Sequence, residues 1–427
     1  MKIKVTPSAI QNACVMVVCV WALTPQLAGS GVARLASVGA VGCWLLIEAW
    51  RPHGIVRAPT LPVVVMYVYS VYTILFEVLT HGASGVISSI QMYIMLFFVL
   101  AQQARRNDME SLYPLFWLAI ALNVVWMTST LVFVSTVDAR AMRVLVRSGA
   151  EAEELSAQGV GGYTMAYGAV LLAPVLTLLS LRPRLIDRLQ PPGFLRAFPL
   201  LPRLTIWYLT AVSFSLVVVS QFSTAVLAMA VVLSVTLILW RLNNLRLLGA
   251  MFATILLVFF GEALFIEVLL QLRTYAEGTN YTLKINDLLA SLQSGDAVGT
   301  AAGRVERYWR SIVLFFGSPL WGVLYYTDVG KHSTLLDAFA RWGVVFGAAL
   351  VYLVSFVQLR ALRALHAVSG GAGVAFGTLA AVWLVFGLNK HFMAAGITIF
   401  IIYPLVYAAM TSQPASKALT RSEAAHA

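Results

Sequence analysis

The stretch LYPLFWLAIALNVVWMTSTLVFVS, residues 112–135, decides the fold of this chain. It is almost wholly apolar and contains no Asp, Glu, Lys or Arg. A helix needs about 20 such residues to cross the ~30 Å hydrocarbon core of a bilayer. Because lipid offers the backbone no hydrogen-bond partner, a single apolar run of this length must satisfy its own backbone groups. The stretch therefore predicts a transmembrane helix.

Runs of the same kind recur along the 427 residues of the chain. Hydrophobic residues make up 60% of it, and charged residues only 11%. These runs predict an all-α polytopic membrane protein with about 12 transmembrane helices. The expected spans lie near residues 8–27, 32–49, 60–80, 84–102, 112–135, 161–181, 205–220, 222–240, 247–271, 335–357, 372–388 and 392–411.

The short connections between the spans differ in charge. One alternate set is rich in Lys and Arg, from Lys2 and Lys4 through Arg105 and Arg106 to the later loops. The opposite set, such as residues 80–84, is nearly bare of both. Short loops rich in Lys and Arg stay in the cytoplasm. The pattern predicts that both termini are cytoplasmic.

The spans and loops divide the chain into three parts. Residues 1–271 form the first part of the bundle, with an outer loop at 136–160. Residues 272–334 form a large outer loop, in which apolar residues recur at helix spacing over 304–317. This segment is expected to be an amphipathic helix lying in the outer interface. Residues 335–427 hold the last three spans and a cytoplasmic tail.

Charge and cysteine content restrict the partners. The formal net charge is +11, but no basic cluster is surrounded by a folded soluble domain, so nucleic acid is not an expected partner. Anionic headgroups of membrane lipids fit the charge better. Cys14, Cys19 and Cys43 all lie inside apolar runs. This predicts neither a disulfide framework nor a thiolate metal site.

The outer loops contain two arginine series. They are Arg140, Arg143 and Arg147 in the first loop, and Arg304, Arg307 and Arg310 in the second. At these spacings each series lies on one side of a helix. Guanidinium groups pair bidentately with phosphate oxygens and keep their charge, so the two series suggest a polyanion site. The alternative is that these side chains reach the headgroups of the outer leaflet.

His332 is the candidate proton acceptor. It precedes the span that begins near residue 335, at the outer mouth of the bundle. Imidazole is suited to proton transfer near neutral pH. The alternative is an interfacial, hydrogen-bonded His. Asp337, at the edge of the same span, is either functional or a partner of Lys331 or Arg341.

Other kinds of site have no motif here. No outer segment carries His and carboxylates at metal-ligand spacing, so neither a metal nor another cofactor is expected. No glycine-rich loop precedes Lys-Ser/Thr, which argues against a nucleotide-driven pump. A serine nucleophile elbow is also absent from the sequence.

Four short motifs follow one another near the last three spans. They are GRVERYW at 303–309, SPLWG at 318–322, HSTL at 332–335 and GVVFG at 343–347. Their order and spacing resemble the signature region of the O-antigen ligase and polymerase superfamily. The chain departs from that pattern at Ser333, where members have Asn, and at Leu324, where they have Gly. A Ser-Arg pair found in an earlier helix of many members is not evident at 220–224.

The resemblance implies a GT-C-like, metal-independent, inverting glycosyltransferase of the bacterial inner membrane, with a helical periplasmic region and a periplasmic active site. The implied donor is a glycan on undecaprenyl diphosphate, and the implied acceptor is a sugar hydroxyl of lipid A-core. In this scheme His332 acts as the base. Arg304 is the first candidate for the diphosphate, with Arg143 and Arg147 as helpers.

Two alternatives remain open from the sequence. An O-antigen polymerase would transfer the same donor to another lipid-linked glycan. A lipid-linked oligosaccharide transporter would need a polar path through the helices, for which intramembrane charges are scarce.

Overall fold

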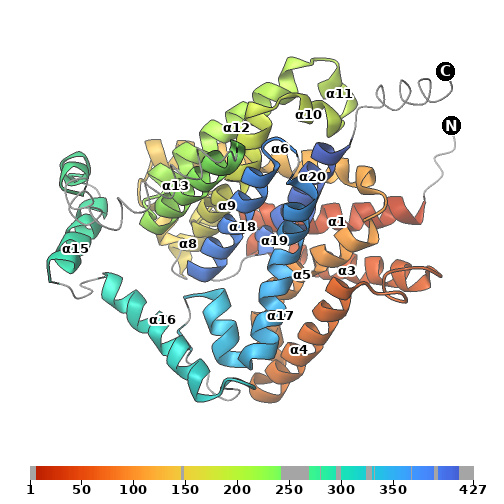
Figure 1. The fold of residues 1–427 in the computed structure, drawn as a ribbon, viewed down its shortest axis with the longest axis horizontal. Coiled ribbons are helices and arrows are strands. Elements are labelled where there is room, and N and C mark those ends of the chain that lie inside the picture. Colours follow the sequence, from red (N-terminus) through yellow and green to blue (C-terminus); the bar gives the residue numbers. More distant parts are fainter. Residues whose placement is uncertain are drawn as a thin grey trace.

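A computed structural model of the chain describes residues 6–145, 149–241, 269–278, 280–294, 300–323, 329–330, 332–366, 368–388 and 393–412. Every regular element within these ranges is a helix (Figure 1). Eight described helices are long and apolar enough to cross a membrane: Gly31–Trp50, Leu61–Gly85, Met109–Thr136, Tyr163–Leu181, Leu200–Val219, Thr334–Leu365, Gly371–Leu388 and Ala394–Thr411. The chain is therefore an all-α, multi-pass membrane protein.

Four expected spans need a separate comment. Three coincide with shorter apolar helices, which are α1 (Pro7–Leu23), α5 (Ile90–Ala104) and α13 (Ser223–Ile238). The expected span at 247–271 lies outside the described residues except for its last three positions. The class predicted from the sequence is thus confirmed, whereas the structure counts eight full-length candidates within its described part.

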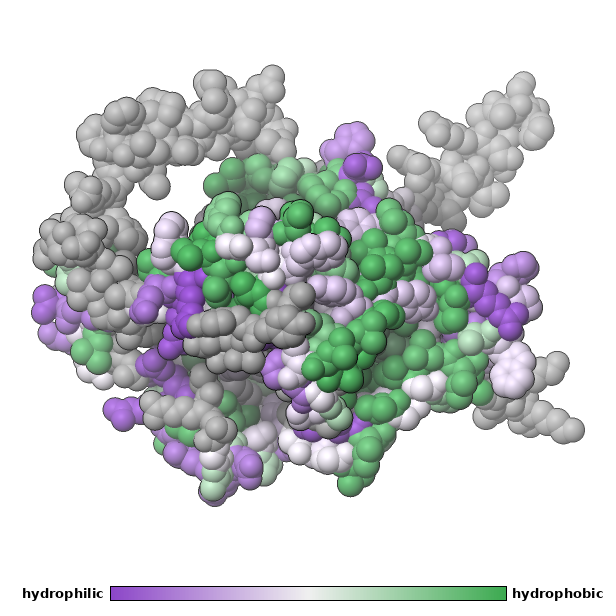
Figure 2. Space-filling model, turned by 90° about the horizontal axis from the view of Figure 1, so that it is seen from below, coloured by the Kyte–Doolittle hydropathy of each residue, from purple (hydrophilic) through white to green (hydrophobic). Residues whose placement is uncertain are grey.

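Lipid-facing helices explain why so much apolar surface is exposed. On α3 (Gly31–Trp50) Val32 and Leu35 are 80% and 74% exposed, and on α4 (Leu61–Ser88) Leu79 is 83% exposed. Soluble proteins rarely expose large contiguous apolar patches. Figure 2 shows hydrophobic residues over the middle and right of the lower face, whereas hydrophilic residues gather mainly on the left. These helices are built to meet hydrocarbon on their outer faces.

The centre of the bundle is formed by α9 (Tyr163–Leu181) and by the last helices, η3 (Thr398–Ile402) and α20 (Tyr403–Thr411). Most of their residues are buried, and the hydroxyl of Tyr403 donates to the carbonyl of Leu171 at 2.5 Å. Helices that are apolar on all sides are typical of the interior of a membrane bundle. α12 (Leu200–Val219), α13 and α18 (Gly371–Leu388) pack around α9.

Shorter elements connect the spans. α2 (Pro25–Ala28) follows α1, and η1 (Met109–Leu112) precedes α6 (Tyr113–Thr136). α7 (Ala141–Val144) and α8 (Ala150–Ala157) follow α6. Later in the chain they are α10 (Arg184–Arg188), α11 (Gly193–Arg196), η2 (Leu239–Arg241), α15 (Asn280–Ser294) and α16 (Thr300–Gly317). α17 spans Thr334–Leu365, and α19 (Met393–Ile397) begins the last span, Ala394–Thr411.

A buried polar cluster holds one end of the bundle together. Arg105, after α5, donates to the side-chain oxygen of Gln11 on α1 at 2.9 Å. Gln11 in turn donates to Glu48 on α3 at 2.7 Å. The second carboxylate oxygen of Glu48 accepts the backbone N–H of Ile55 at 2.8 Å. Buried charges are tolerated when they are paired in this way. The cluster fixes three helices at the end that the charge pattern assigns to the cytoplasm.

Candidate functional site

The site forms where α16, at the lower left of Figure 1, meets the residues that lead into α17. Arg307, on α16, contacts Nε2 of His332 through its Nη1 atom. A guanidinium has donors and no acceptor, so Nε2 must accept in this contact. Two of the residues singled out in the sequence are therefore in direct contact.

Ser311 fastens α16 to the segment around His332. Its side chain is 1% exposed, and its hydroxyl donates to Asp337 Oδ1 at 2.7 Å. The same hydroxyl accepts the backbone N–H of Gly330 at 3.0 Å. A Cβ atom at position 330 would lie 2.2 Å from the carbonyl oxygen of Arg307. Glycine is required there, because only it lets the two backbones approach so closely.

Ser333 begins α17. Its hydroxyl accepts the backbone N–H of Leu336 at 3.1 Å, which satisfies one of the free N–H groups at the helix start. The hydroxyl also lies 3.5 Å from the carbonyl oxygen of Phe386 on α18. Ser333 therefore caps α17 and keeps His332 directly before the helix.

Two glycines join the loop after α16 to the middle of α17. Gly322 and Gly343 have φ of +73° and +71°, and the turn at Gly343 divides α17 into two segments. The backbone N–H of Val323 donates to Ala340 at 2.9 Å, and that of Val344 donates to Pro319 at 2.8 Å. The motifs SPLWG and GVVFG are thus paired by their backbones. This pairing holds α16 against the first segment of α17.

An ion-pair cluster ties α17 to α4. Arg341 Nη1 lies 3.2 Å from Glu77 Oε1, and His81 Nδ1 lies 3.2 Å from Glu77 Oε2. The Glu77 side chain is 4% exposed. A carboxylate buried this deeply needs such partners. The sequence offered Arg341 as one partner for Asp337, and the structure instead shows Arg341 with Glu77 and Asp337 with Ser311.

The remaining arginines are spread over two elements. Arg310 is exposed on α16, and Arg304 belongs to the same helix, but its side chain lies outside the described part. Arg140 is the exposed N-cap of α7, and Arg143 lies in its last turn. α7 ends at Val144, so this helix does not reach position 147. Arg147 lies outside the described residues.

Arg143 lies near Tyr281 on α15, which the sequence reasoning missed. The Tyr281 hydroxyl donates to the carbonyl of Val218 at 2.8 Å. Burial raises the pKa of the Tyr281 phenol to about 12, and the charge of Arg143 opposes part of this rise. The hydrogen bond joins α15 to the end of α12, with Arg143 of α7 close enough to influence the phenol.

Glu77 and Ser311 were also missed. Glu77 had a visible signal, because it is a lone acid within an apolar run and such residues are functional candidates by default. Ser311 had none, since a single Ser on an amphipathic helix is unremarkable in a sequence. The described part of the chain contains no group of three His, Cys, Asp or Glu side chains placed as metal ligands.

The fold and the site define a class, an all-α membrane protein with a polar cluster at one end of its bundle. No protein-family model matches the chain, and no curated protein matches its sequence.

Proposed function

We propose that this protein is a membrane glycosyltransferase of the O-antigen ligase type. It would transfer a glycan from undecaprenyl diphosphate to a sugar hydroxyl of lipid A-core, at the periplasmic face of the bacterial inner membrane. The observation that carries the proposal is the contact of Arg307 with His332. It combines a fixed positive charge, suited to a diphosphate, with an imidazole, suited to accepting a proton from a hydroxyl.

The contact suggests an order of events. Without substrate, the guanidinium of Arg307 occupies the lone pair of His332 Nε2. Diphosphate oxygens are stronger acceptors for a guanidinium than imidazole, because they carry charge. Donor binding therefore draws Arg307 away and frees Nε2. His332 can therefore accept a proton only once the donor is bound.

In the chemical step, the acceptor hydroxyl attacks the anomeric carbon of the donor glycan. A new C–O bond forms, and the bond between that carbon and the diphosphate oxygen breaks, with inversion. The electron pair leaves with undecaprenyl diphosphate, and the hydroxyl proton goes to His332 Nε2. Arg307, with Arg304 and Arg310 on the same helix, stabilises the charge that develops on the leaving group.

The proposal includes a topology. About 12 spans in a GT-C-like bundle would leave both termini in the cytoplasm. The cluster of Arg105, Gln11 and Glu48 would mark the cytoplasmic end, and the Arg307–His332 pair would face the periplasm. Support comes from the alternation of basic and bare loops.

Reconstitution tests the function directly. Purified protein in liposomes receives undecaprenyl-diphosphate-linked glycan and lipid A-core, in the presence of excess chelator. The expected product is glycan on lipid A-core, together with released undecaprenyl diphosphate. Growth of the lipid-linked glycan instead of transfer to lipid A-core would indicate a polymerase. Movement of intact donor across the bilayer without transfer would indicate a transporter.

A further inference from the structure

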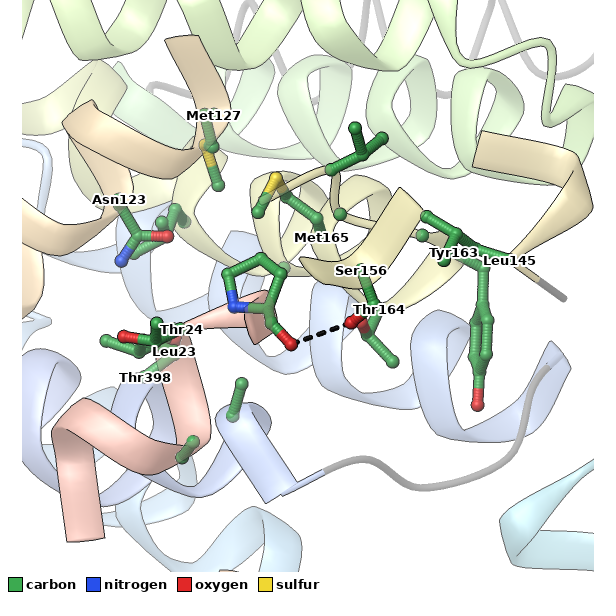
Figure 3. Close-up of a pocket in the computed structure, with 18 residues that line it drawn as sticks. Leu23, Thr24, Asn123, Met127, Leu145, Ser156, Tyr163, Thr164, Met165 and Thr398 are labelled. Atoms are coloured by element: carbon green, nitrogen blue, oxygen red, sulfur yellow. Dashed lines mark hydrogen bonds between the residues drawn. The ribbon is translucent and has the colours of Figure 1, made fainter. Parts of the chain in front are cut away.

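A cavity of about 220 Å³ lies among α1, α6, α9 and α19, away from the Arg307–His332 pair. Its walls come from four regions of the sequence: the α1–α2 junction, α6, the segment 145–172 with α9, and the start of the last helices. Figure 3 shows Thr24, Thr398 and Asn123 on one side and Ser156 and Thr164 on the other. The volume corresponds to about seven water molecules, at roughly 30 Å³ each. A single sugar ring is of this size class.

The described lining is mostly apolar and carries several hydroxyl groups. Among the described residues that line the cavity there is no Asp, Glu, Lys, Arg or His. Its hydroxyl groups come from Thr24, Thr164, Thr398, Ser156 and Tyr163. Such a lining offers hydrogen bonds without compensating a charge, so a diphosphate would be disfavoured there. A neutral ligand rich in hydroxyl groups is the chemistry that matches.

Several of these polar side-chain atoms can form a hydrogen bond with a ligand. Within the described part of the chain, no hydrogen bond is seen for the side-chain hydroxyls of Thr24, Thr164 and Thr398. Asn123 donates from Nδ2 to the carbonyl of Ala119 at 2.8 Å, which leaves its Oδ1 as an acceptor. Binding sites for small ligands characteristically combine an apolar lining with a few convergent polar groups. Met127 and Met165 supply the apolar part above these groups (Figure 3).

Two hydrogen bonds hold one wall of the cavity in place. Ser156 on α8 donates to the carbonyl of Pro25 on α2 at 2.8 Å, the dashed line in Figure 3. Gly161 N–H donates to Thr130 Oγ1 at 2.8 Å and anchors the chain that enters α9. These hydrogen bonds between side chains and backbone fix the position of the wall, so the cavity is part of the fold itself.

The cavity and the Arg307–His332 pair belong to the same end of the bundle. Tyr308, next to Arg307, donates to the carbonyl of Leu388 at the end of α18 at 3.1 Å. Ala394, near the start of α19, lines the cavity. The first outer loop contributes as well, since Leu145 follows α7 and lines the same space.

We infer that this cavity binds one neutral sugar unit of a glycan substrate. The identity of the glycan rests on the proposed function, whereas the neutral, hydroxyl-rich chemistry rests on the lining alone. A sugar held here would orient the rest of the glycan toward the Arg307–His332 pair. Either the donor or the acceptor glycan has the required chemistry.

Gly168 offers a clean way to fill the cavity. It lines the space, it lies within α9, and a Cβ atom built on it has no neighbour within 4 Å. Gly168→Leu should therefore occupy the cavity without disturbing the backbone, and it removes a residue unfavourable in helices. Gly39 is the matched control, because it is also helical with nothing within 4 Å of its Cβ but lies on α3.

The test is saturation-transfer NMR on purified protein in a detergent without a sugar headgroup. The probes are neutral methyl hexosides, with inorganic diphosphate as competitor. We expect saturation transfer to the sugar ring in wild type and in Gly39→Leu, its loss in Gly168→Leu, and no competition by diphosphate. Thr164→Val, which removes one hydroxyl, should weaken binding about threefold to tenfold.

Absence of hexoside binding in wild type, or undiminished binding in Gly168→Leu, would overturn the inference. Hexoside binding that is lost in Gly168→Leu, in a protein without transferase activity, would support the sugar site and refute the proposed function. The reverse result, wild-type transfer by Gly168→Leu, would refute the sugar site and leave the function standing. Competition by delipidated donor or delipidated acceptor glycan then tells which substrate uses the cavity.

Discussion

Arg307 and His332 are 25 positions apart in sequence and meet through a loop that closes on α16. The residue that makes this approach possible is Gly330, which leaves room for the Arg307 carbonyl. Ser311 then bonds both the Gly330 backbone and Asp337. These few side chains determine where His332 stands relative to α16.

Replacement of Arg307 tests its part in donor binding. Arg307→Ala removes a charge-assisted bond to phosphate, so affinity for undecaprenyl diphosphate should fall about 10–100-fold. Arg307→Lys should restore only part of it, because an ammonium cannot form the planar two-donor fork. Binding is measured on purified protein, with Arg106→Ala, at the opposite end of the bundle, as the control. Equal affinity in Arg307→Ala and Arg106→Ala would remove Arg307 from the diphosphate site.

Gly343 allows α17 to contact the backbone of the loop that follows α16. A Cβ atom there would lie 2.1 Å from the carbonyl oxygen of Leu320, and its positive φ alone costs a non-glycine residue about 1–3 kcal/mol. Gly343→Ala should lower the melting temperature of the detergent-solubilised protein, whereas Gly39→Ala on α3 should leave it unchanged or higher. Similar melting temperatures for the two variants would contradict the close backbone contact between Gly343 and Leu320.

At the scale of elements, α4 and α17 are connected by Glu77 and Arg341. Arg341→Met leaves the buried carboxylate without its guanidinium and should destabilise the protein by about 1–3 kcal/mol. Glu77→Gln in the Arg341→Met background should recover part of that loss, because it removes the carboxylate charge that has lost its guanidinium partner. The measurement is a double-mutant cycle of unfolding in detergent. Strictly additive single effects would show that the pair contributes no coupling.

The sequence predicted the helices better than the contacts between them. The apolar runs at 112–135 and 161–181 correspond closely to α6 and α9, because their composition alone imposes a membrane helix. The division of α17 at Gly343 was not foreseen, since it depends on backbone contact with a loop some twenty residues earlier. Arg307 and His332 were each predicted as candidates. Their contact was not, because nothing in helix periodicity tells which of Arg304, Arg307 and Arg310 faces the loop.

The proposed orientation of the protein in the membrane rests on the Lys and Arg bias between loops. Single cysteines introduced by Ala150→Cys and Ser294→Cys, in a background without the native cysteines, should react with an impermeant thiol reagent from the periplasmic side. Leu195→Cys should not react until the membrane is permeabilised. Labelling of Leu195→Cys alone in intact cells would reverse the topology and place the Arg307–His332 pair in the cytoplasm.

The most direct test of the account is glycan transfer by His332→Ala, with donor binding measured on the same preparation. A base acts mainly in the transition state, so transfer should fall about 10²–10⁴-fold while affinity for undecaprenyl diphosphate stays near wild type. Transfer is measured at matched membrane abundance, with lipid-linked donor and lipid A-core supplied. Near-wild-type transfer by His332→Ala would contradict the central claim that glycan transfer takes place at the Arg307–His332 pair.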